Sequence, residues 1–292
     1  MKTFNLSITL FISLFTGLQG YAQPAENNYP EETIGWKLAM QASTYRPLTF
    51  AETLDKVIAC GLRYVEAFPQ QQIGGGIPGA TDFRMDAQTR RQVKQMLEDK
   101  GIKLIAYGVV NPATREEWSQ LFDFAKDMGI ETIVSEPKVE SMPLLDELTA
   151  EYGIKVAIHN HAIPSPYWNP ETVRSTVIDH NQAIGACADI GHWMRSGLSP
   201  LESLKLLEGR LISIHMKDLN ATGDPDAHDV WWGQGKANLK AVIHEMQRQS
   251  FRGVIAVEYE YRRNDPAFDS VPAIRESVAY LRSTLLQSLQ SR

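Results

Sequence analysis

Eight short runs of β-branched and apolar residues alternate with amphipathic segments from residue 35 onward, and this alternation restricts the possible folds most strongly. The runs predict strands at 36–42, 64–68, 103–110, 132–136, 155–161, 185–189, 211–217 and 254–260. The amphipathic segments predict helices at 50–60, 86–100, 115–128, 143–152, 170–179, 200–207, 239–249 and 273–286. Eight strand–helix units in about 255 residues match the size of a closed barrel. We therefore expect an α/β fold, a single-domain (β/α)8 TIM barrel.

Residue types at the predicted helix ends support this count. Ser199-Pro200 places an N-cap residue before a proline at the first helical position, and glycines follow several predicted helices. A doubly wound open sheet is the alternative, but no Gly-x-Gly-x-x-Gly follows the first strand. Gly74-Gly75-Gly76 lies in the long connection after the second strand, and we interpret it as a flexible rim loop rather than a phosphate-binding loop.

Residues 1–22 have the pattern of a signal peptide. Lys2 precedes an apolar run at 6–18, and small residues lead up to Ala22, the predicted cleavage site. Residues 23–34 are then an N-terminal extension, and residues 35–292 form the barrel. A membrane anchor is the alternative, but the run is short for a span, which takes about 20 apolar residues. We expect an exported, periplasmic protein without membrane contact after cleavage.

The composition narrows the classes of partner. The chain has 292 residues and is 43% hydrophobic, which is enough for one large core. A formal net charge of -6 argues against nucleic acid, because binding to phosphates relies on Lys and Arg. Cys60 and Cys187 belong to different layers of the expected barrel, so we predict two buried free thiols rather than a disulfide. A small-molecule substrate fits better, and a homo-oligomer is left open.

Ionisable residues stand at the ends of four consecutive predicted strands: Glu136, Asp189, His215 and Glu258. Because the carboxyl ends of barrel strands converge on one rim, side chains far apart in sequence can ligate one ion there. Strand alternation places further ionisable groups on interior faces, namely His159, His161, Lys217 and Glu260. The pattern predicts a metal-dependent enzyme.

Three motifs carry a resemblance to a known family. They are Ile214-His215-Met216-Lys217-Asp218 followed by Gly233-Gln234-Gly235, Asp189-Ile190-Gly191-His192, and Val257-Glu258. In this order and on these strands, they make the chain similar to the xylose isomerase-like TIM barrel superfamily, in its sugar phosphate isomerase/epimerase branch. The resemblance covers most of the chain after the predicted signal peptide, and it implies a divalent metal ion at the rim of the barrel.

The resemblance implies ligands from strands five to eight, commonly Glu, Asp, His and Glu. Asp189, His215 and Glu258 match the last three positions, but the fifth strand has His159 where many relatives have Glu. Either His159 replaces the acid, or Glu136 reaches in from the fourth strand, and we favour Glu136. Three carboxylates and one imidazole suit Mn²⁺ or Mg²⁺, whereas a second imidazole favours Zn²⁺.

The implied chemistry is enolisation of a sugar. A divalent ion bound to a carbonyl oxygen and the neighbouring hydroxyl stabilises the enediolate formed when a base removes the proton between them. We predict Lys217, His161 and Glu258 as acid–base residues. We predict as substrate-binding residues Glu66, His159, His192, Trp232 and Gln234, of which Trp232 offers a ring for stacking.

The expected activity is that of an isomerase or epimerase. Its substrate is an unphosphorylated keto-sugar, inosose or keto-glycoside, because export and the lack of a phosphate loop argue against sugar phosphates. A hydratase or hydro-lyase is the alternative, for which the paired imidazoles of His159 and His161 supply a further acid or base. A non-catalytic sugar-binding protein and a DNA-repair endonuclease are the other classes, and the acidic charge argues against the latter.

Overall fold

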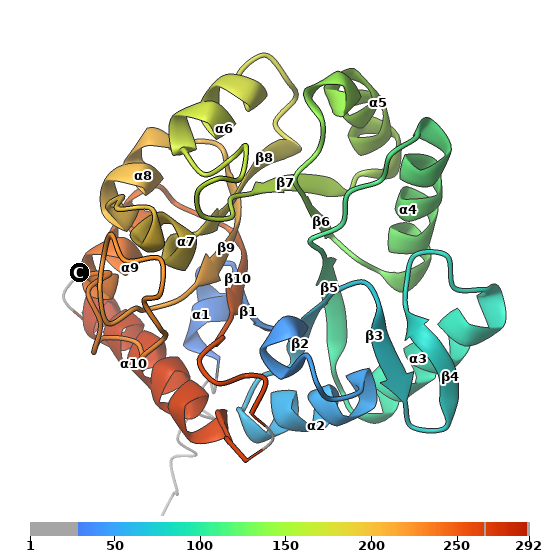
Figure 1. Cartoon of the computed structure of the whole chain (residues 1–292), viewed down its shortest axis with the longest axis horizontal. Helices are drawn as coiled ribbons and strands as arrows, with labels where there is room; N and C mark the ends of the chain where they lie inside the picture. Colours follow the sequence, from blue (N-terminus) through green and yellow to red (C-terminus); the bar gives the residue numbers. More distant parts are fainter. Residues whose placement is uncertain (1–28, 266, 291–292) are drawn as a thin grey trace, which may run out of the picture.

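Eight parallel strands pair into a closed ring in the part of the chain that the computed structural model describes, residues 29–265 and 267–290 (Figure 1). Around the ring the order is β1, β10, β9, β8, β7, β6, β5 and β2. The strands are β1 Trp36–Gln41, β2 Tyr64–Ala67, β5 Lys103–Tyr107, β6 Thr132–Ser135, β7 Lys155–His159, β8 Ile184–Asp189, β9 Leu211–Met216 and β10 Gly253–Val257. Each lies within a predicted strand or starts one residue before it, which confirms the (β/α)8 TIM barrel.

Helices surround the ring on its outside (Figure 1). They are α2 Phe50–Ala59, α3 Ala87–Asp99, α4 Arg115–Met128, α5 Met142–Tyr152, α6 Pro170–Val177, α8 Pro200–Leu206, α9 Leu239–Arg248 and α10 Val271–Gln290. Local chemistry sets several starts: Thr49 and Glu52 form a capping box at α2, and Ser199 caps α8. A short helix outside the predicted set, α7 (Ile190–Arg195), follows β8 directly and is capped by Asp189.

The connection after β2 contains a hairpin that the sequence does not predict, and the three glycines form its turn. β3 (Gln71–Gly74) and β4 (Ile77–Thr81) pair antiparallel beside α2. Gly74, Gly75 and Gly76 make the turn with φ of +72°, +59° and +82°, a region that favours glycine. A Cβ on Gly74 would lie 2.5 Å from Thr49, so the turn packs closely against the start of α2. The hairpin lacks a long alternating pattern, which explains why the sequence does not reveal it.

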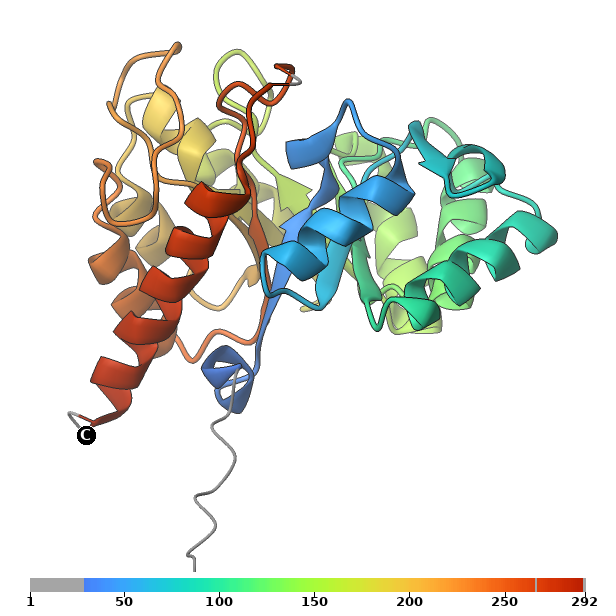
Figure 2. The ribbon, with the colours of Figure 1, turned by 90° about the horizontal axis from the view of Figure 1, so that it is seen from below.

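The described part of the predicted N-terminal extension packs on the barrel. Helix α1 (Pro30–Thr33) lies at the end of the barrel opposite to the loops that follow the strands (Figure 2). Glu31 is buried there and forms an ion pair of 2.8 Å with Arg282 of α10. The predicted signal peptide, residues 1–22, lies outside the described residues. Within the described ranges, no helix combines the length and the apolar character that crossing a membrane requires.

Alternation along the strands separates two environments. On β1, Leu38 and Met40 pack in the large core between ring and helices, whereas Ala39 lies in a small cluster with Val254 of β10. Small interior residues give way to polar ones at the carboxyl ends of the strands. The register pairs Asp189 with His215 between β8 and β9, so ionisable groups of neighbouring strands lie at one level. Both cysteines are buried and free, as predicted.

The loop between β9 and α9 is held by one buried carboxylate. Asp218, directly after β9, accepts hydrogen bonds from the backbone N–H groups of Gly233 and Gly235 at 2.9 Å and of Ala237 at 3.0 Å. A Cβ on Gly235 would lie 2.1 Å from Asp218 Oδ1, so glycine is required for this approach. The Gly-Gln-Gly motif therefore serves the anchoring of this loop.

Replacing Asp218 with Ala is expected to lower the free energy of unfolding by about 1–3 kcal/mol, because three backbone donors lose their common acceptor. Urea denaturation followed by circular dichroism measures the change. Asp226→Ala, which alters an exposed acid of the same loop, serves as the matched control and is expected to leave stability unchanged. Equal stability of the two variants would contradict the anchoring role.

Candidate active site

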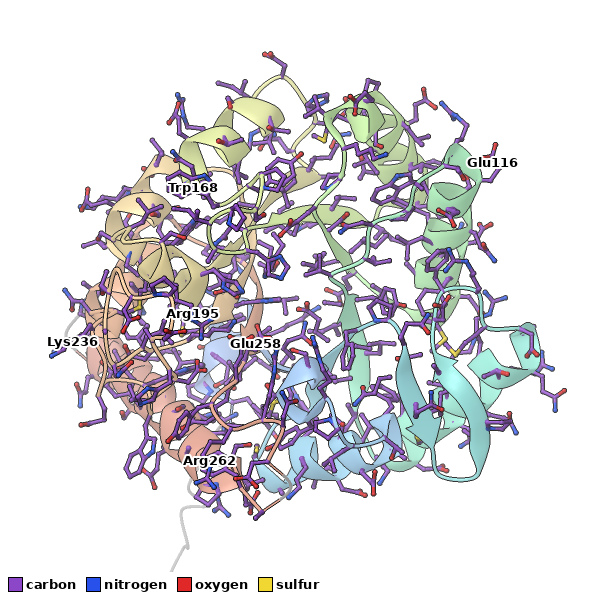
Figure 3. The ribbon with its side chains drawn as sticks, in the orientation of Figure 1. Glu116, Trp168, Arg195, Lys236, Glu258 and Arg262 are labelled. Atoms are coloured by element: carbon purple, nitrogen blue, oxygen red, sulfur yellow. The ribbon has the colours of Figure 1, made fainter. Side chains whose placement is uncertain are left out.

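A cavity of about 880 Å³ opens at the carboxyl ends of the strands. Its volume lies within the range of about 300–1,000 Å³ that small-molecule sites occupy. Five of the predicted site residues line it: His159, His161, His192, His215 and Glu258. Figure 3 shows Glu258 near the barrel axis, whereas Lys236 and Glu116 stand at the periphery. The ionisable residues predicted at the strand ends therefore mark the position of this cavity.

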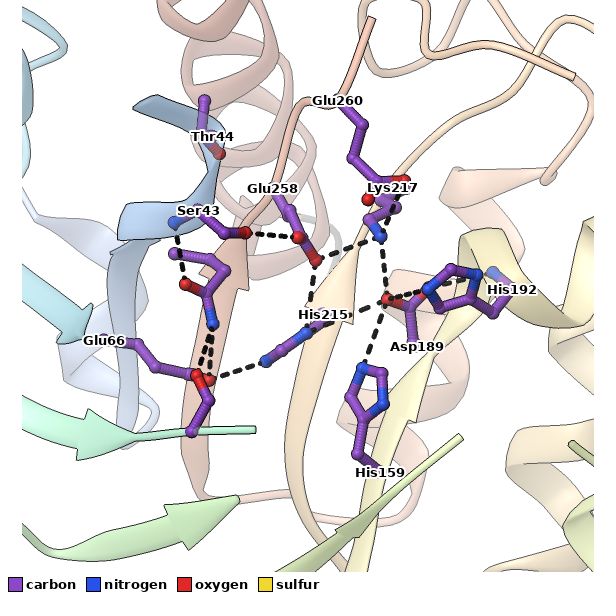
Figure 4. A network of polar contacts seen from close by, with 12 residues as sticks. Ser43, Thr44, Glu66, His159, Asp189, His192, His215, Lys217, Glu258 and Glu260 are labelled. Atoms are coloured by element: carbon purple, nitrogen blue, oxygen red, sulfur yellow. Dashed lines mark hydrogen bonds and ion pairs between the residues drawn. The ribbon is translucent and has the colours of Figure 1, made fainter. Parts of the chain in front are cut away.

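Four donor atoms follow one another across the floor of this cavity (Figure 4). His159 Nε2 lies 3.5 Å from Asp189 Oδ2, which lies 3.8 Å from His215 Nδ1. His215 Nδ1 in turn lies 3.3 Å from Glu258 Oε2. Ligand atoms of His159, Asp189 and His215 all lie within 4.8 Å of one another. Neighbouring strands β7, β8, β9 and the end of β10 each supply one of these side chains.

The orientation of His215 is fixed by Glu66 from behind the cavity. Glu66 is fully buried, and its Oε1 lies 2.9 Å from His215 Nε2 and accepts a hydrogen bond of 2.8 Å from Gln41 Nε2. The other ring nitrogen, His215 Nδ1, is buried and has no hydrogen-bond partner among the described residues. A carboxylate that holds one nitrogen of an imidazole while the other faces outward is the usual support of a metal-ligating histidine. The structure thus places Glu66 behind His215 and outside the lining of the cavity.

Lys217 neutralises the carboxylates of the floor. Its ammonium is fully buried and lies 2.9 Å from Asp189 Oδ2, 3.0 Å from Glu258 Oε2 and 3.3 Å from Glu260 Oε2. Burial alone would lower the pKa of Lys217, but these acids, Asp189 first, hold it well above its usual range. Lys217 is not among the side chains that line the cavity. We infer that it positions the carboxylates rather than exchanging protons with a substrate.

Glu136 lies beside the floor and is not brought together with Asp189, His215 and Glu258. Its Oε1 accepts a hydrogen bond of 3.1 Å from the backbone N–H of His161, contacts the ring of His161 and lies 3.4 Å from His159 Nδ1. Its Oε2 accepts a hydrogen bond of 3.0 Å from Ser165. Hydrogen bonds from the loop after β7 thus turn the Glu136 carboxylate away from Asp189, His215 and Glu258. The sequence leaves open whether His159 or Glu136 joins the other metal ligands. In the structure, His159 is the one whose ligand atom lies near those of Asp189 and His215.

Three imidazoles form the wall of the cavity next to Glu136. The ring centroids of His159 and His161 are 4.4 Å apart, and those of His161 and His192 are 5.0 Å apart. Burial lowers the pKa of His192 to about 3, although Asp189 opposes this shift, so His192 is neutral at neutral pH. The pKa of His159 is raised to about 9, because hydrogen bonds to Asp189 and Glu136 outweigh the effect of burial. The side chain of His161 is 48% exposed and reaches solvent.

Trp232 and Gln234 lie away from this cavity. Trp232 is buried in the core, and its backbone N–H donates to Ser277 of α10 at 3.1 Å. Gln234 is exposed and borders a separate, smaller pocket together with Trp231. The anchoring of the loop by Asp218 explains both positions.

Several residues of the site are absent from the predicted set. Ser43 donates a hydrogen bond of 2.7 Å to Glu258 Oε1, and Gln41 supports Glu66. Gln41 ends the first strand on its interior face, so the strand-end argument that selected Asp189 would also have selected it. Ser43 follows in the short 3-10 helix η1 (Ala42–Tyr45), where no sequence pattern indicates its direction.

Three donor atoms of the floor, from His159, Asp189 and His215, are close enough to one another to hold a divalent ion, and Glu258 adjoins His215. Neighbouring donors of a tetrahedral site with bonds of about 2.0–2.2 Å lie about 3.3–3.6 Å apart. Asp189 Oδ2 lies at similar distances, 3.5 Å and 3.8 Å, from His159 Nε2 and His215 Nδ1. The unpartnered His215 Nδ1 lies in the middle of the series. Two imidazoles and two carboxylates suit a borderline ion such as Zn²⁺ better than Mg²⁺.

Removal of His159 is expected to abolish metal binding, whereas removal of Glu136 is expected only to weaken it. Glu136 contacts the far nitrogen of His159, and loss of such an outer partner typically costs about 10–100-fold in metal affinity. Calorimetric titration of Zn²⁺ and Mn²⁺ into His159→Ala and Glu136→Ala, with metal content per chain, measures the difference. Retention of metal by His159→Ala together with its loss from Glu136→Ala would reverse the assignment.

Lys217→Met is expected to lower the free energy of unfolding of metal-free protein by about 3–5 kcal/mol, because buried carboxylates lose their cation. A divalent ion should restore more stability to this variant than to the wild-type protein, since it replaces the missing positive charge. Urea denaturation with and without Zn²⁺ measures both effects. Lys205→Met, which breaks an exposed pair with Glu202, is the control. Equal metal-induced stabilisation of variant and wild type would contradict this role of Lys217.

Comparisons with known proteins agree with the fold. A family model described as xylose isomerase-like TIM barrel matches residues 54–284. The inosose isomerase of Bacillus subtilis (strain 168) is 28% identical over 167 residues, which are 49% of this chain and 58% of that protein. The chain therefore spans about three fifths of the length of this relative.

Solved structures extend the likeness to nearly the whole barrel. An uncharacterised protein from Parabacteroides distasonis ATCC 8503 has 34% identity and a TM-score of 0.69, covering 85% of this chain and 99% of its own. The probable 3-DHS dehydratase AsbF of Bacillus anthracis (14%, TM-score 0.64, 84% and 98% covered) and the IolI protein with a binding zinc atom (18%, 0.61, 86% and 98%) share the fold. The chain belongs to the xylose isomerase-like TIM barrel family.

Proposed function

We propose that this protein is a divalent-metal-dependent enzyme that enolises an unphosphorylated keto-sugar, inosose or keto-glycoside and acts as an isomerase or epimerase. The observation that carries the proposal is the series of four donor atoms from His159, Asp189, His215 and Glu258 on the floor of a sugar-sized cavity. The inosose isomerase among the relatives supports this class of reaction.

A divalent ion held by these four side chains, Zn²⁺ or Mn²⁺, would polarise a carbonyl and the hydroxyl next to it. The neighbour with a zinc atom supports a metal of this kind. Gln41 and Glu66 keep His215 in the tautomer that presents Nδ1 to the cavity. Lys217 keeps the two carboxylates ionised, so the floor is prepared for a cation before substrate enters.

Proton transfer falls to two groups that line the cavity. Glu258 is held by Ser43 through Oε1, and its ionised state is favoured because Lys217 and His215 lower its pKa well below the usual range despite burial. His161, positioned by Glu136, lies on the wall formed by β7 and the loop after it. We assign Glu258 to the removal of the proton next to the carbonyl and His161 to its return from another side. A positioned acid and base of this kind are what epimerisation requires.

A hydratase or hydro-lyase is the second candidate. The supporting observation is the half-exposed ring of His161, which Glu136 holds at the edge of the cavity where water has access. An imidazole–carboxylate pair at that place suits the addition or removal of water beside the enolised carbon. The dehydratase among the structural neighbours supports the same alternative.

The enzyme is further proposed to work in the periplasm. The support is the sequence pattern of residues 1–22, which predicts export and cleavage after Ala22. Mass spectrometry of the mature protein, purified from the periplasmic fraction, is expected to find Gln23 at its N-terminus. An intact Met1 in the cytoplasmic fraction would contradict export.

Proton exchange in D2O tests the proposed activity. Zn²⁺- or Mn²⁺-loaded enzyme is expected to exchange the proton next to the carbonyl of one compound among keto-sugars, inososes and 3-keto-glycosides, as followed by NMR. Glu258→Gln is expected to lower the exchange rate at least about 100-fold, within the range of general acid–base catalysis. Asp226→Ala should leave it unchanged.

The products distinguish the candidates. An epimer or isomer supports the first proposal, and net gain or loss of water supports the second. Metal-loaded protein that exchanges no proton of any compound would contradict enolisation of this substrate class. Protein that binds no metal but binds a sugar would be a non-catalytic binding protein.

A further inference from the structure

The cavity extends beyond its floor to a rim that the proposed chemistry does not use. This rim is lined by residues of the segment between η1 and α2, of the turn after β2 and of strand β3, among them Arg46, Phe68 and Gln71. Within the described part of the chain, none of these three side chains contacts the four donor atoms of the floor. A sugar unit that reacts at the floor therefore leaves these groups available for another part of the substrate.

Arg46 brings an unpaired positive charge to the rim. Arg263, the other arginine of the cavity lining, lies 2.9 Å from Glu260 and 3.8 Å from Glu258. Arg46 has no carboxylate within 4.0 Å among the described residues, and it is exposed. Its charge is therefore available to a ligand in the cavity.

The guanidinium of Arg46 is also held in place. It lies over the ring of Phe68, 5.5 Å from the centroid, in a cation–π contact. The backbone N–H of Arg46 donates to Ser43 at 3.2 Å at the end of η1, whose residues are all buried. A preorganised guanidinium loses less conformational entropy on binding, which favours recognition over simple solvation.

Gln71 ties strand β3 to the segment before α2 and to α2 itself. Its side-chain Nε2 donates to Leu48 O at 3.0 Å and to Thr53 at 2.9 Å, which fixes the direction of the amide. Its Oε1 is buried and has no hydrogen-bond partner among the described residues. This oxygen has no exposed surface and is out of reach of a ligand in the cavity, so Gln71 shapes the rim through its hydrogen bonds to Leu48 and Thr53.

We propose that Arg46 and Phe68 form a second subsite that binds a carboxylate-bearing sugar unit of the substrate, remote from the carbon that reacts. This proposal rests on the proposed function and specifies its substrate class as an acidic sugar or glycoside. Arg46 pairs with the carboxylate, while the cation–π contact with Phe68 holds its guanidinium. No bond of the substrate is made or broken there.

A carboxylate fits the rim better than a phosphate. Phosphate is often bound at a helix N-terminus, and Thr49, the N-cap of α2, does line the cavity. The carboxylate of Glu52, however, accepts hydrogen bonds from the backbone N–H and the hydroxyl of Thr49, at 2.8 and 2.7 Å. This negative charge opposes a phosphate at the start of α2 and leaves Arg46 as the single cation of the subsite.

Ligand-observed NMR with three probes, D-glucuronate, D-glucose and D-glucose 6-phosphate, tests the subsite on the intact, metal-loaded protein. D-glucuronate is expected to bind about tenfold more tightly than D-glucose, in line with a charge-assisted hydrogen bond. Arg46→Ala is expected to abolish this preference, and Arg46→Lys to keep part of it. Arg91→Ala, an exposed arginine on α3, is the control and should keep all of it. Unchanged melting temperatures show that the variants are folded.

Several results would overturn the subsite. These are equal affinity of the wild-type protein for D-glucose and D-glucuronate, a preference that survives in Arg46→Ala, or no binding of any probe. Tighter binding of D-glucose 6-phosphate than of D-glucuronate would assign the rim to phosphate instead. Because binding is measured without turnover, an Arg46-dependent preference in a protein that exchanges no deuterium leaves the subsite standing while enolisation fails. Deuterium exchange without the preference would support enolisation and overturn the subsite.

Discussion

A single buried ammonium lets the carboxyl ends of two strands carry three ionised acids in the same small volume. Lys217 projects from the end of β9 between Asp189 of β8 and the two glutamates that follow β10. Buried carboxylates are costly unless they are paired, so the floor of the cavity depends on this contact. The packing is close: a Cβ on Gly191 would lie 2.6 Å from the Cδ atom of Lys217, which requires glycine near the start of α7.

A second series of hydrogen bonds fixes the orientation of His215. Gln41 of β1 binds Glu66 of β2, and Glu66 binds His215 of β9 across the interior of the barrel. Lys217 and Glu66 therefore act on the same floor from different strands, one by charge and one by orientation. The groups that line the cavity are held by groups behind them, as expected of a preorganised site.

Much of this arrangement follows from the sequence, because strand ends converge in a parallel barrel. Asp189, His215 and Glu258 are predictable since each directly ends or follows a strand on its interior face. Glu136 has the same position on β6, but Ser165 and the backbone of His161 turn its carboxylate aside. Depth cannot be predicted either: Lys217 points inward as predicted, but Lys217 and Glu66, both predicted to act on or bind the substrate, lie behind the lining of the cavity. Contacts made by a later loop or by a neighbouring strand decide these cases, and residue type and spacing do not encode them.

The β3–β4 hairpin stands outside the hydrogen-bonded ring of eight strands and contributes none of the four donor atoms. Its turn rests on α2, and its first strand delivers Gln71 to the edge of the cavity. Insertions or substitutions in the hairpin can therefore accumulate without disturbing the strand ends. In such a barrel, the reaction is inherited with the ring, while the range of accepted substrates evolves separately in an appendage.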